Sequence, residues 1–190
     1  MPRKSLYGRR EIQMAAYNRS AASFFLALAE NQQEGEFYSS NASLLYSAFT
    51  LEAFFNTIGA TLKLNDEGFD RASPGDKLRI IAAKLEVKLD RRSRPYSSLT
   101  PLFTFRNAVA HGRQERQNIK QKVDPQWTAL QMVKSLESEW ERYCNKANAR
   151  RAYDDVRQVA ADLCDQAGLS NFPGFPFGVS SSGVYRAHST

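Results

Sequence analysis

The chain has 190 residues, of which 42% are apolar and 12% aromatic, and this is enough for one globular domain with a substantial core. Its two cysteines, Cys144 and Cys164, exclude a disulfide framework and a Cys-rich zinc site, and they fit a reducing compartment. The 26 basic and 20 acidic side chains leave a net charge of +6, which favours polyanionic partners and is equally compatible with a solvated cationic face.

The first residues lack the pattern of a signal peptide. Their basic side chains are followed by the amphipathic residues 11–13 rather than by an apolar run. The longest apolar stretch, residues 21–29, is interrupted by Ser23 and is far shorter than the roughly 20 residues that a membrane span needs. We therefore expect a soluble, cytoplasmic protein that does not bind a membrane.

Two long amphipathic helices are predicted first. The first covers roughly residues 8–33, and its apolar stripe is expected to face the bundle. This stripe consists of Met14, Tyr17, Ala21, Phe24, Phe25 and Leu28. The second helix is expected to start at Ser40 or Asn41, both good N-caps, and to run to about Leu64. Its buried seam consists of Leu44, Ala48, Leu51, Phe55, Ile58 and Leu62.

Two polar residues, Glu52 and Asn56, lie four residues apart beside that seam. A carboxylate and an amide near a core cost free energy unless they are hydrogen-bonded. We therefore expect both side chains to have partners.

Residues 66–71 are predicted as a loop, and Ser73 with Pro74 begins a third helix that runs to about Leu89. Its inner face is expected to consist of Leu78, Ile81, Ala82, Leu85 and Leu89, whereas Lys77, Lys84 and Lys88 share a face expected to be exposed. A fourth helix is predicted from Thr100 and Pro101 to Gly112, because glycine suits the left-handed position after a helix.

Residues 113–123 are predicted as a connecting loop or frayed helix, after which Asp124 and Pro125 start a helical region that reaches Gly168. The pattern leaves open whether this region is one helix or two, broken around residues 145–148. Its buried stripes are expected at Trp127, Val133, Leu136, Trp140, Tyr143 and Ala147, and at Tyr153, Val156, Ala160, Leu163 and Ala167.

Residues 171–190 have no helical period and contain Phe172, Phe175 and Phe177. We expect an extended aromatic tail that docks onto the body or onto a second subunit. The predicted architecture is thus all-α: residues 1–170 form one up-and-down bundle of about five to six helices, and residues 171–190 form the tail.

The segment most suggestive of chemistry is Arg106-Asn107-Ala108-Val109-Ala110-His111. It resembles the HEPN superfamily, whose nucleases carry an Arg, an adjacent polar residue, three variable residues and a His. Residues 46–56, with Glu52 and Asn56, resemble the second helix of that family. The resemblance covers roughly residues 40–112 and implies a small helical bundle that cleaves RNA.

The residue types suit RNA cleavage without a metal ion or another cofactor. Attack of a ribose 2′-hydroxyl on the adjacent phosphate needs a base, an acid and positive charge. Histidine titrates near neutrality and can do either proton transfer, so His111 is the candidate for this role. Arg106 would hold the phosphate through its fork of donors. Asn107 lies four residues before His111, so its amide could orient the imidazole.

Helix geometry places Arg106 and His111 roughly 140° apart, so that one chain converges them poorly. In the family, two protomers usually share one cleft, which implies a homodimer here. Basic residues could line the approach of RNA to that cleft, although each could equally be part of a solvated face. These residues are Lys84, Lys88, Arg113 and Arg116.

The leading hypothesis is a HEPN endoribonuclease that leaves a 2′,3′-cyclic phosphate. By analogy with the family, it would be a toxin or a phage-defence effector with an antitoxin or regulatory protein as partner. A second hypothesis is a non-catalytic HEPN module that dimerises and binds a nucleotide, RNA or a protein. A third is a helical interaction protein unrelated to that family, in which Arg106 is a structural partner of Glu52, Asn107 caps or links helices, and His111 interacts with a helix dipole.

Overall fold

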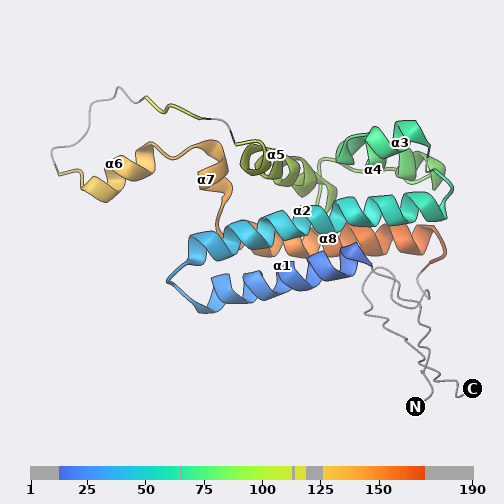
Figure 1. Ribbon diagram of the computed structural model, residues 1–190, viewed down its shortest axis with the longest axis horizontal. Helices are drawn as coiled ribbons and strands as arrows, with labels where there is room; N and C mark the ends of the chain where they lie inside the picture. The colour runs from blue at the N-terminus through green and yellow to red at the C-terminus, as the bar shows by residue number, and fades with distance from the viewer. Residues whose placement is uncertain (1–12, 65, 113, 119–125, 170–190) are drawn as a thin grey trace, which may run out of the picture.

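The computed structural model describes residues 13–64, 66–112, 114–118 and 126–169, and within these ranges it contains eight α-helices and no strand. Three long helices lie side by side: α1 (Met14–Asn31), α2 (Glu36–Thr61) and α8 (Lys146–Gln166) (Figure 1). The prediction of an all-α bundle is confirmed. None of the described helices combines the length and the apolar character that crossing a membrane requires.

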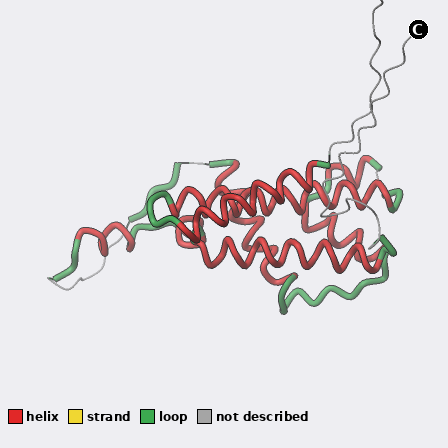
Figure 2. The backbone as a smooth tube through the Cα atoms, turned by 90° about the horizontal axis from the view of Figure 1, so that it is seen from below, coloured by secondary structure: helices red, strands yellow, loops and turns green. Residues whose placement is uncertain are grey.

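The shorter helices cover the other side of α2. They are α3 (Glu67–Arg71), α4 (Pro74–Lys84), the 3₁₀ turn η1 (Tyr96–Ser98) and α5 (Leu99–Ala110). The chain then returns to α8 through α6 (Ala129–Ser135) and α7 (Glu139–Tyr143). Figures 1 and 2 both show one helix standing away from the bundle, which Figure 1 labels as α6. None of the side chains of α6 is buried. The described residues contain more helices than the five to six predicted, because the sequence did not predict the short helices α3, α6 and α7 as separate helices.

The core is centred on α2. Leu44, Ala48, Leu51, Phe55 and Ile58 are fully buried, as predicted, because α1, α4, α5 and α8 all contact this helix. From α8, Val156, Ala160 and Leu163 are buried as expected, together with Ala149, Ala152 and Val159. From α5, Leu99, Leu102 and Phe105 point into the same core.

The predicted inner face of α1 is wrong in part: Ala21, Phe25 and Leu28 are half-buried, but the other three predicted residues are exposed. The buried residues are Ala15, Ala16, Ala22, Leu26 and Ala29, whereas Met14, Tyr17 and Phe24 are 53–60% exposed. Small side chains let α1 approach α2 closely, and the Ser43 hydroxyl donates to the Ala22 carbonyl at 3.0 Å between the two helices. Both faces of α1 are apolar, and size rather than hydrophobicity selects the buried one.

Two predicted helix boundaries differ because of the backbone conformation. Gly35, with φ +75°, precedes α2, so Ser40 and Asn41 lie inside the helix instead of capping it. Glu86, with φ +57°, follows the end of α4 at Lys84, which is earlier than the predicted Leu89. The spacing of apolar residues in the sequence does not reveal a left-handed residue such as Glu86, which is not glycine.

One further segment was assigned incorrectly from the sequence, and the predicted fourth helix is present as α5 but ends differently. Residues 66–71 contain α3, because the Asp66 side chain accepts a hydrogen bond from Phe69 N at 2.8 Å and caps it. Gly112 does not adopt the left-handed conformation, and the His111 backbone amide closes the last turn of α5 on the Asn107 carbonyl at 3.0 Å.

The region between α5 and Gly168 is three helices rather than one or two. Capping boxes at Thr128 and Ser138 start α6 and α7, and the Asn145 side chain caps α8. As a consequence, Val133, Leu136 and Ala147 are exposed, contrary to prediction. The predicted helix start at Asp124 and Pro125 and the tail 171–190 lie outside the described residues.

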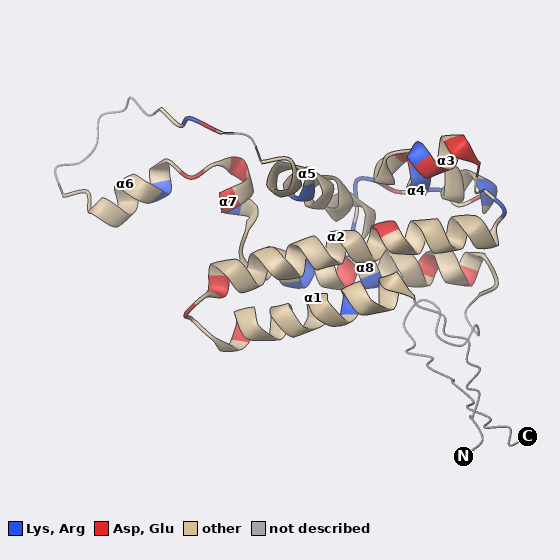
Figure 3. Ribbon diagram, in the orientation of Figure 1, with Lys and Arg blue, Asp and Glu red and all other residues tan. Residues whose placement is uncertain are grey.

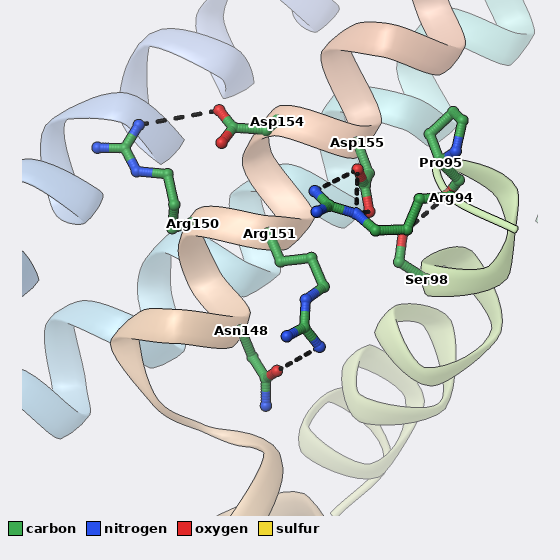
Figure 4. A network of polar contacts seen from close by, with 8 residues as sticks. All are labelled: Arg94, Pro95, Ser98, Asn148, Arg150, Arg151, Asp154 and Asp155. Carbon is green, nitrogen blue, oxygen red and sulfur yellow. Dashed lines mark hydrogen bonds and ion pairs between the residues drawn. The ribbon is translucent and has the colours of Figure 1, made fainter.

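A bidentate ion pair fastens the segment before α5 to α8. The Arg94 guanidinium donates from Nε to both Asp155 oxygens at 3.0 Å and from Nη2 to Oδ1 at 2.7 Å (Figure 4). The Asp155 side chain is 5% exposed and that of Arg94 57%. The Ser98 hydroxyl donates to the Pro95 carbonyl at 2.8 Å and closes the turn that leads into α5.

Removal of this carboxylate is expected to destabilise the fold. Asp155→Ala should lower the free energy of unfolding by about 1–3 kcal/mol, less than for a fully buried pair because Arg94 remains solvated. Urea unfolding measures this, with Asp154→Ala as the matched control, since Asp154 is half exposed and 3.8 Å from Arg150. Equal losses in the two variants would contradict a special role of Asp155.

Candidate functional site

The Arg106–His111 segment occupies the C-terminal end of α5. Leu99, Leu102 and Phe105 anchor this helix in the core, which leaves its last turn at the surface. Arg106 is half-buried, whereas Asn107 and His111 are exposed. The helix therefore presents the three motif residues where a ligand from solvent can reach the imidazole.

Arg106 forms an ion pair with Glu52 of α2, where its Nη2 donates to Oε2 at 2.5 Å and also contacts Oε1. The two side chains are 20% and 24% exposed. Arg106 Nη1 donates to Asn107 Oδ1 at 2.7 Å, and its guanidinium carbon lies 6.0 Å from the centroid of the Phe49 ring. The guanidinium is thus fixed from three sides, and the partner expected for Glu52 is Arg106.

His111 lies at the C-cap of α5, with φ −108° and ψ 23°. Within the described ranges, no hydrogen bond joins its ring to Asn107, whose amide oxygen instead accepts from Arg106. Arg106 points to α2 while His111 lies exposed at the helix end, in keeping with the separation expected from helix geometry. One chain therefore supplies two separated halves of the predicted site.

Asn56 has a different neighbourhood from Glu52. Its Oδ1 accepts from Lys77 Nζ of α4 at 2.6 Å, and the same ammonium lies 5.3 Å from the centroid of the Phe69 ring. Lys77 is 9% exposed, so the prediction that it shares an exposed face with Lys84 and Lys88 is wrong. Burial of the aliphatic stem of Lys77 between α2 and α4 favours this inward position. The hydrogen bond to Asn56 then joins the two helices.

The basic residues predicted to guide RNA are only partly described. Lys84, Lys88 and Arg116 are exposed, and none has an ion pair among the residues that the structure describes. Figure 3 shows basic positions spread over several helices, with acidic positions among them. Arg113 lies outside those residues. The exposed cations fit the approach of a polyanion and a solvated surface equally well.

A cavity that sequence reasoning missed lies beside α5. Its volume is about 720 Å³, and its lining includes Thr104, Phe105 and Ala108 of α5 with Trp140 and Tyr143 of α7. Burial raises the pKa of Tyr143 to about 12, so this phenol stays protonated at neutral pH. The two α7 aromatics were expected in a buried stripe; both are half-buried, and the centroid of the Tyr143 ring lies 5.5 Å from that of Phe105.

The Glu52–Arg106 pair should show measurable coupling. In a double-mutant cycle with Glu52→Gln and Arg106→Gln, we expect about 1–3 kcal/mol of coupling in the free energy of unfolding, since both charges are mostly buried. The exposed pair of Glu67 and Arg71 serves as the control, for which about 0.3–0.5 kcal/mol is expected. Additive losses at Glu52 and Arg106 would show that the ion pair does not hold the guanidinium.

Comparison of the chain with protein-family models, with curated proteins and with solved structures gives no match. What can be said of its activity therefore rests on the residues themselves, above all on the geometry at the end of α5.

Proposed function

We propose that this chain is an endoribonuclease of the HEPN type, which cleaves RNA by internal transesterification without a metal ion. The proposal is carried by one observation: an exposed imidazole, His111, lies five residues beyond a guanidinium that is held by Glu52, Asn107 and Phe49. The two groups provide proton transfer and positive charge, the two needs of this reaction.

In the proposed reaction, a neutral His111 accepts the proton of the ribose 2′-hydroxyl. The 2′-oxygen then bonds to the adjacent phosphorus while the bond from phosphorus to the 5′-oxygen breaks. A protonated imidazole gives its proton to this leaving oxygen. The products are a 2′,3′-cyclic phosphate and a 5′-hydroxyl, and Arg106 stabilises the charge on the phosphoryl oxygens.

The reaction uses one base and one acid, whereas each chain offers one imidazole at the end of α5. The second imidazole would come from His111 of a second copy, with the exposed side of α5 at the contact. This arrangement also supplies a second guanidinium, which offsets the separation of Arg106 and His111 within one chain.

The family resemblance gives the proposal its biological setting. An RNA-cleaving protein of this type would act in the cytoplasm as a toxin or defence effector. An antitoxin or regulatory protein would restrain it. Lys84, Lys88 and Arg116 would attract RNA through counterion release.

One observation favours a second candidate function. The charge of Arg106 is neutralised by Glu52, and its side chain is only 20% exposed. A guanidinium in this state has less charge to offer a phosphate in the transition state. The second candidate is therefore a HEPN module that binds RNA, a nucleotide or a protein without cleaving RNA.

Cleavage of a labelled single-stranded RNA in excess chelator distinguishes the two functions. We expect the wild-type chain to cleave, and His111→Ala to reduce the rate by about 10²–10⁴-fold through loss of proton transfer. Lys134→Ala, which removes an exposed cation of α6, is the control and should cleave at nearly the wild-type rate. The upstream product should end in a 2′,3′-cyclic phosphate, and the downstream product should begin with a 5′-hydroxyl that a kinase can phosphorylate.

The same assay can refute the proposal. Cleavage that persists in His111→Ala, or that stops when the chelator is added, contradicts the mechanism. Tight RNA binding by the wild-type chain without any cleavage supports the binding module instead.

A further inference from the structure

The outer side of α1 carries a regular apolar row, which we name the outer seam: Met14, Tyr17, Ala21, Phe24 and Leu28. Met14 is 55%, Tyr17 53% and Phe24 60% exposed, although they are large apolar side chains. They lie on a different side of α1 from the alanine-rich face that packs on α2 and α8, while Ala21 and Leu28 are half-buried between the two. The helix itself lies at the edge of the bundle (Figure 1). Large exposed apolar rows of this kind mark interaction surfaces.

The spacing of the seam specifies the kind of partner. Its residues follow one another at three, four, three and four positions, which is the heptad spacing of helices that pair along their length. The seam is about 21 Å long. The helix α6 also carries exposed apolar side chains, but it has only seven residues and is about 10 Å long, so it is too short to cover the seam.

The absence of charged residues from the seam favours a protein partner over RNA. The charged residues of α1 are Arg19 and Glu30, and neither belongs to the seam. Glu30 is bound by Arg150 of α8, whose Nε donates to it at 2.8 Å. RNA binding depends on cations that neutralise phosphates, which the seam does not provide. An uncharged seam can instead face an identical seam without repulsion.

We propose that the outer seam pairs with the outer seam of a second copy of this chain, antiparallel and about a two-fold axis at Ala21. Met14 and Leu28 lie seven residues on either side of Ala21, so each faces the other of the second copy, and Tyr17 and Phe24, four residues before and three after it, lie close to each other across the contact. The small Ala21 side chains let the two helices approach at the axis. A single symmetric contact covers both seams.

The antiparallel direction follows from electrostatics. Parallel pairing would place the like ends of the two helix dipoles side by side, whereas antiparallel pairing places opposite ends together, which is the favourable arrangement.

Ring contacts continue the apolar surface from the seam toward Arg106. The ring centroids of Phe24 and Phe25 are 5.4 Å apart, those of Phe25 and Tyr46 5.8 Å, and those of Tyr46 and Phe49, the ring beside Arg106, 6.2 Å.

The proposed pairing does not depend on the nuclease proposal, because it uses α1, whereas sharing of His111 uses α5. Variants of the seam therefore test the one contact without the other.

The mass of the full chain in solution is the first test. We expect wild-type chains to associate, and Ala21→Glu/Phe24→Glu to raise the dissociation constant at least tenfold, because four carboxylates meet at the axis. Tyr38→Glu is the matched control, since Tyr38 is 77% exposed but lies outside the seam. Helical circular dichroism should be the same in all three chains.

Cross-linking tests the geometry. Cys144 and Cys164 are buried, and burial raises the pKa of both thiols to about 12, so an added surface cysteine reacts first. Ala21→Cys should form a disulfide between copies, whereas Ser23→Cys, on the flank of α1 toward Tyr153, should not. Met14→Cys and Leu28→Cys chains should cross-link when mixed and not when alone.

Several results would overturn the proposal. They are a monomeric wild-type chain, an unchanged mass in the seam variant, or equal cross-linking at positions 21 and 23. Pairing that occurs only after removal of residues 170–190 would show that the chain's own tail covers the seam. Loss of RNA binding in the seam variant with no change in mass would assign the seam to RNA instead.

Discussion

Enclosure of α2 is the constraint on which the rest of the structure depends. Leu44, Leu51, Phe55 and Ile58 are fully buried only because α1, α4, α5 and α8 surround the helix. Removal of these side chains from water is the main stabilising contribution to such a bundle. It also fixes Glu52, the residue after Leu51, at the junction with α5.

The position of Glu52 has two opposing effects on the candidate site. Its carboxylate holds the Arg106 guanidinium in one orientation, together with Asn107 and Phe49. It also neutralises the charge that a phosphate would meet. A partly buried ion pair is therefore an orienting device whose contribution to catalysis depends on how readily the guanidinium exchanges a carboxylate oxygen for a phosphate oxygen.

The helix α1 has two apolar faces, and they differ in side-chain size. The alanine-rich face accepts close packing against α2 and α8, whereas the face with Met14, Tyr17 and Phe24 carries side chains too large for that contact. A helix that is apolar on both faces belongs between two layers. The proposed second copy supplies the layer that one described chain lacks.

The sequence alone determined the all-helical class and most of the buried seams of α2 and α8, because apolar spacing at the helical period is a local property. It also located Arg106, Asn107 and His111 at one helix end. Tertiary packing decided which face of α1 is buried, that Lys77 is inside with Asn56, and that Arg106 belongs to Glu52. These outcomes depend on the sizes and charges of residues distant in the chain, so no local pattern contains them.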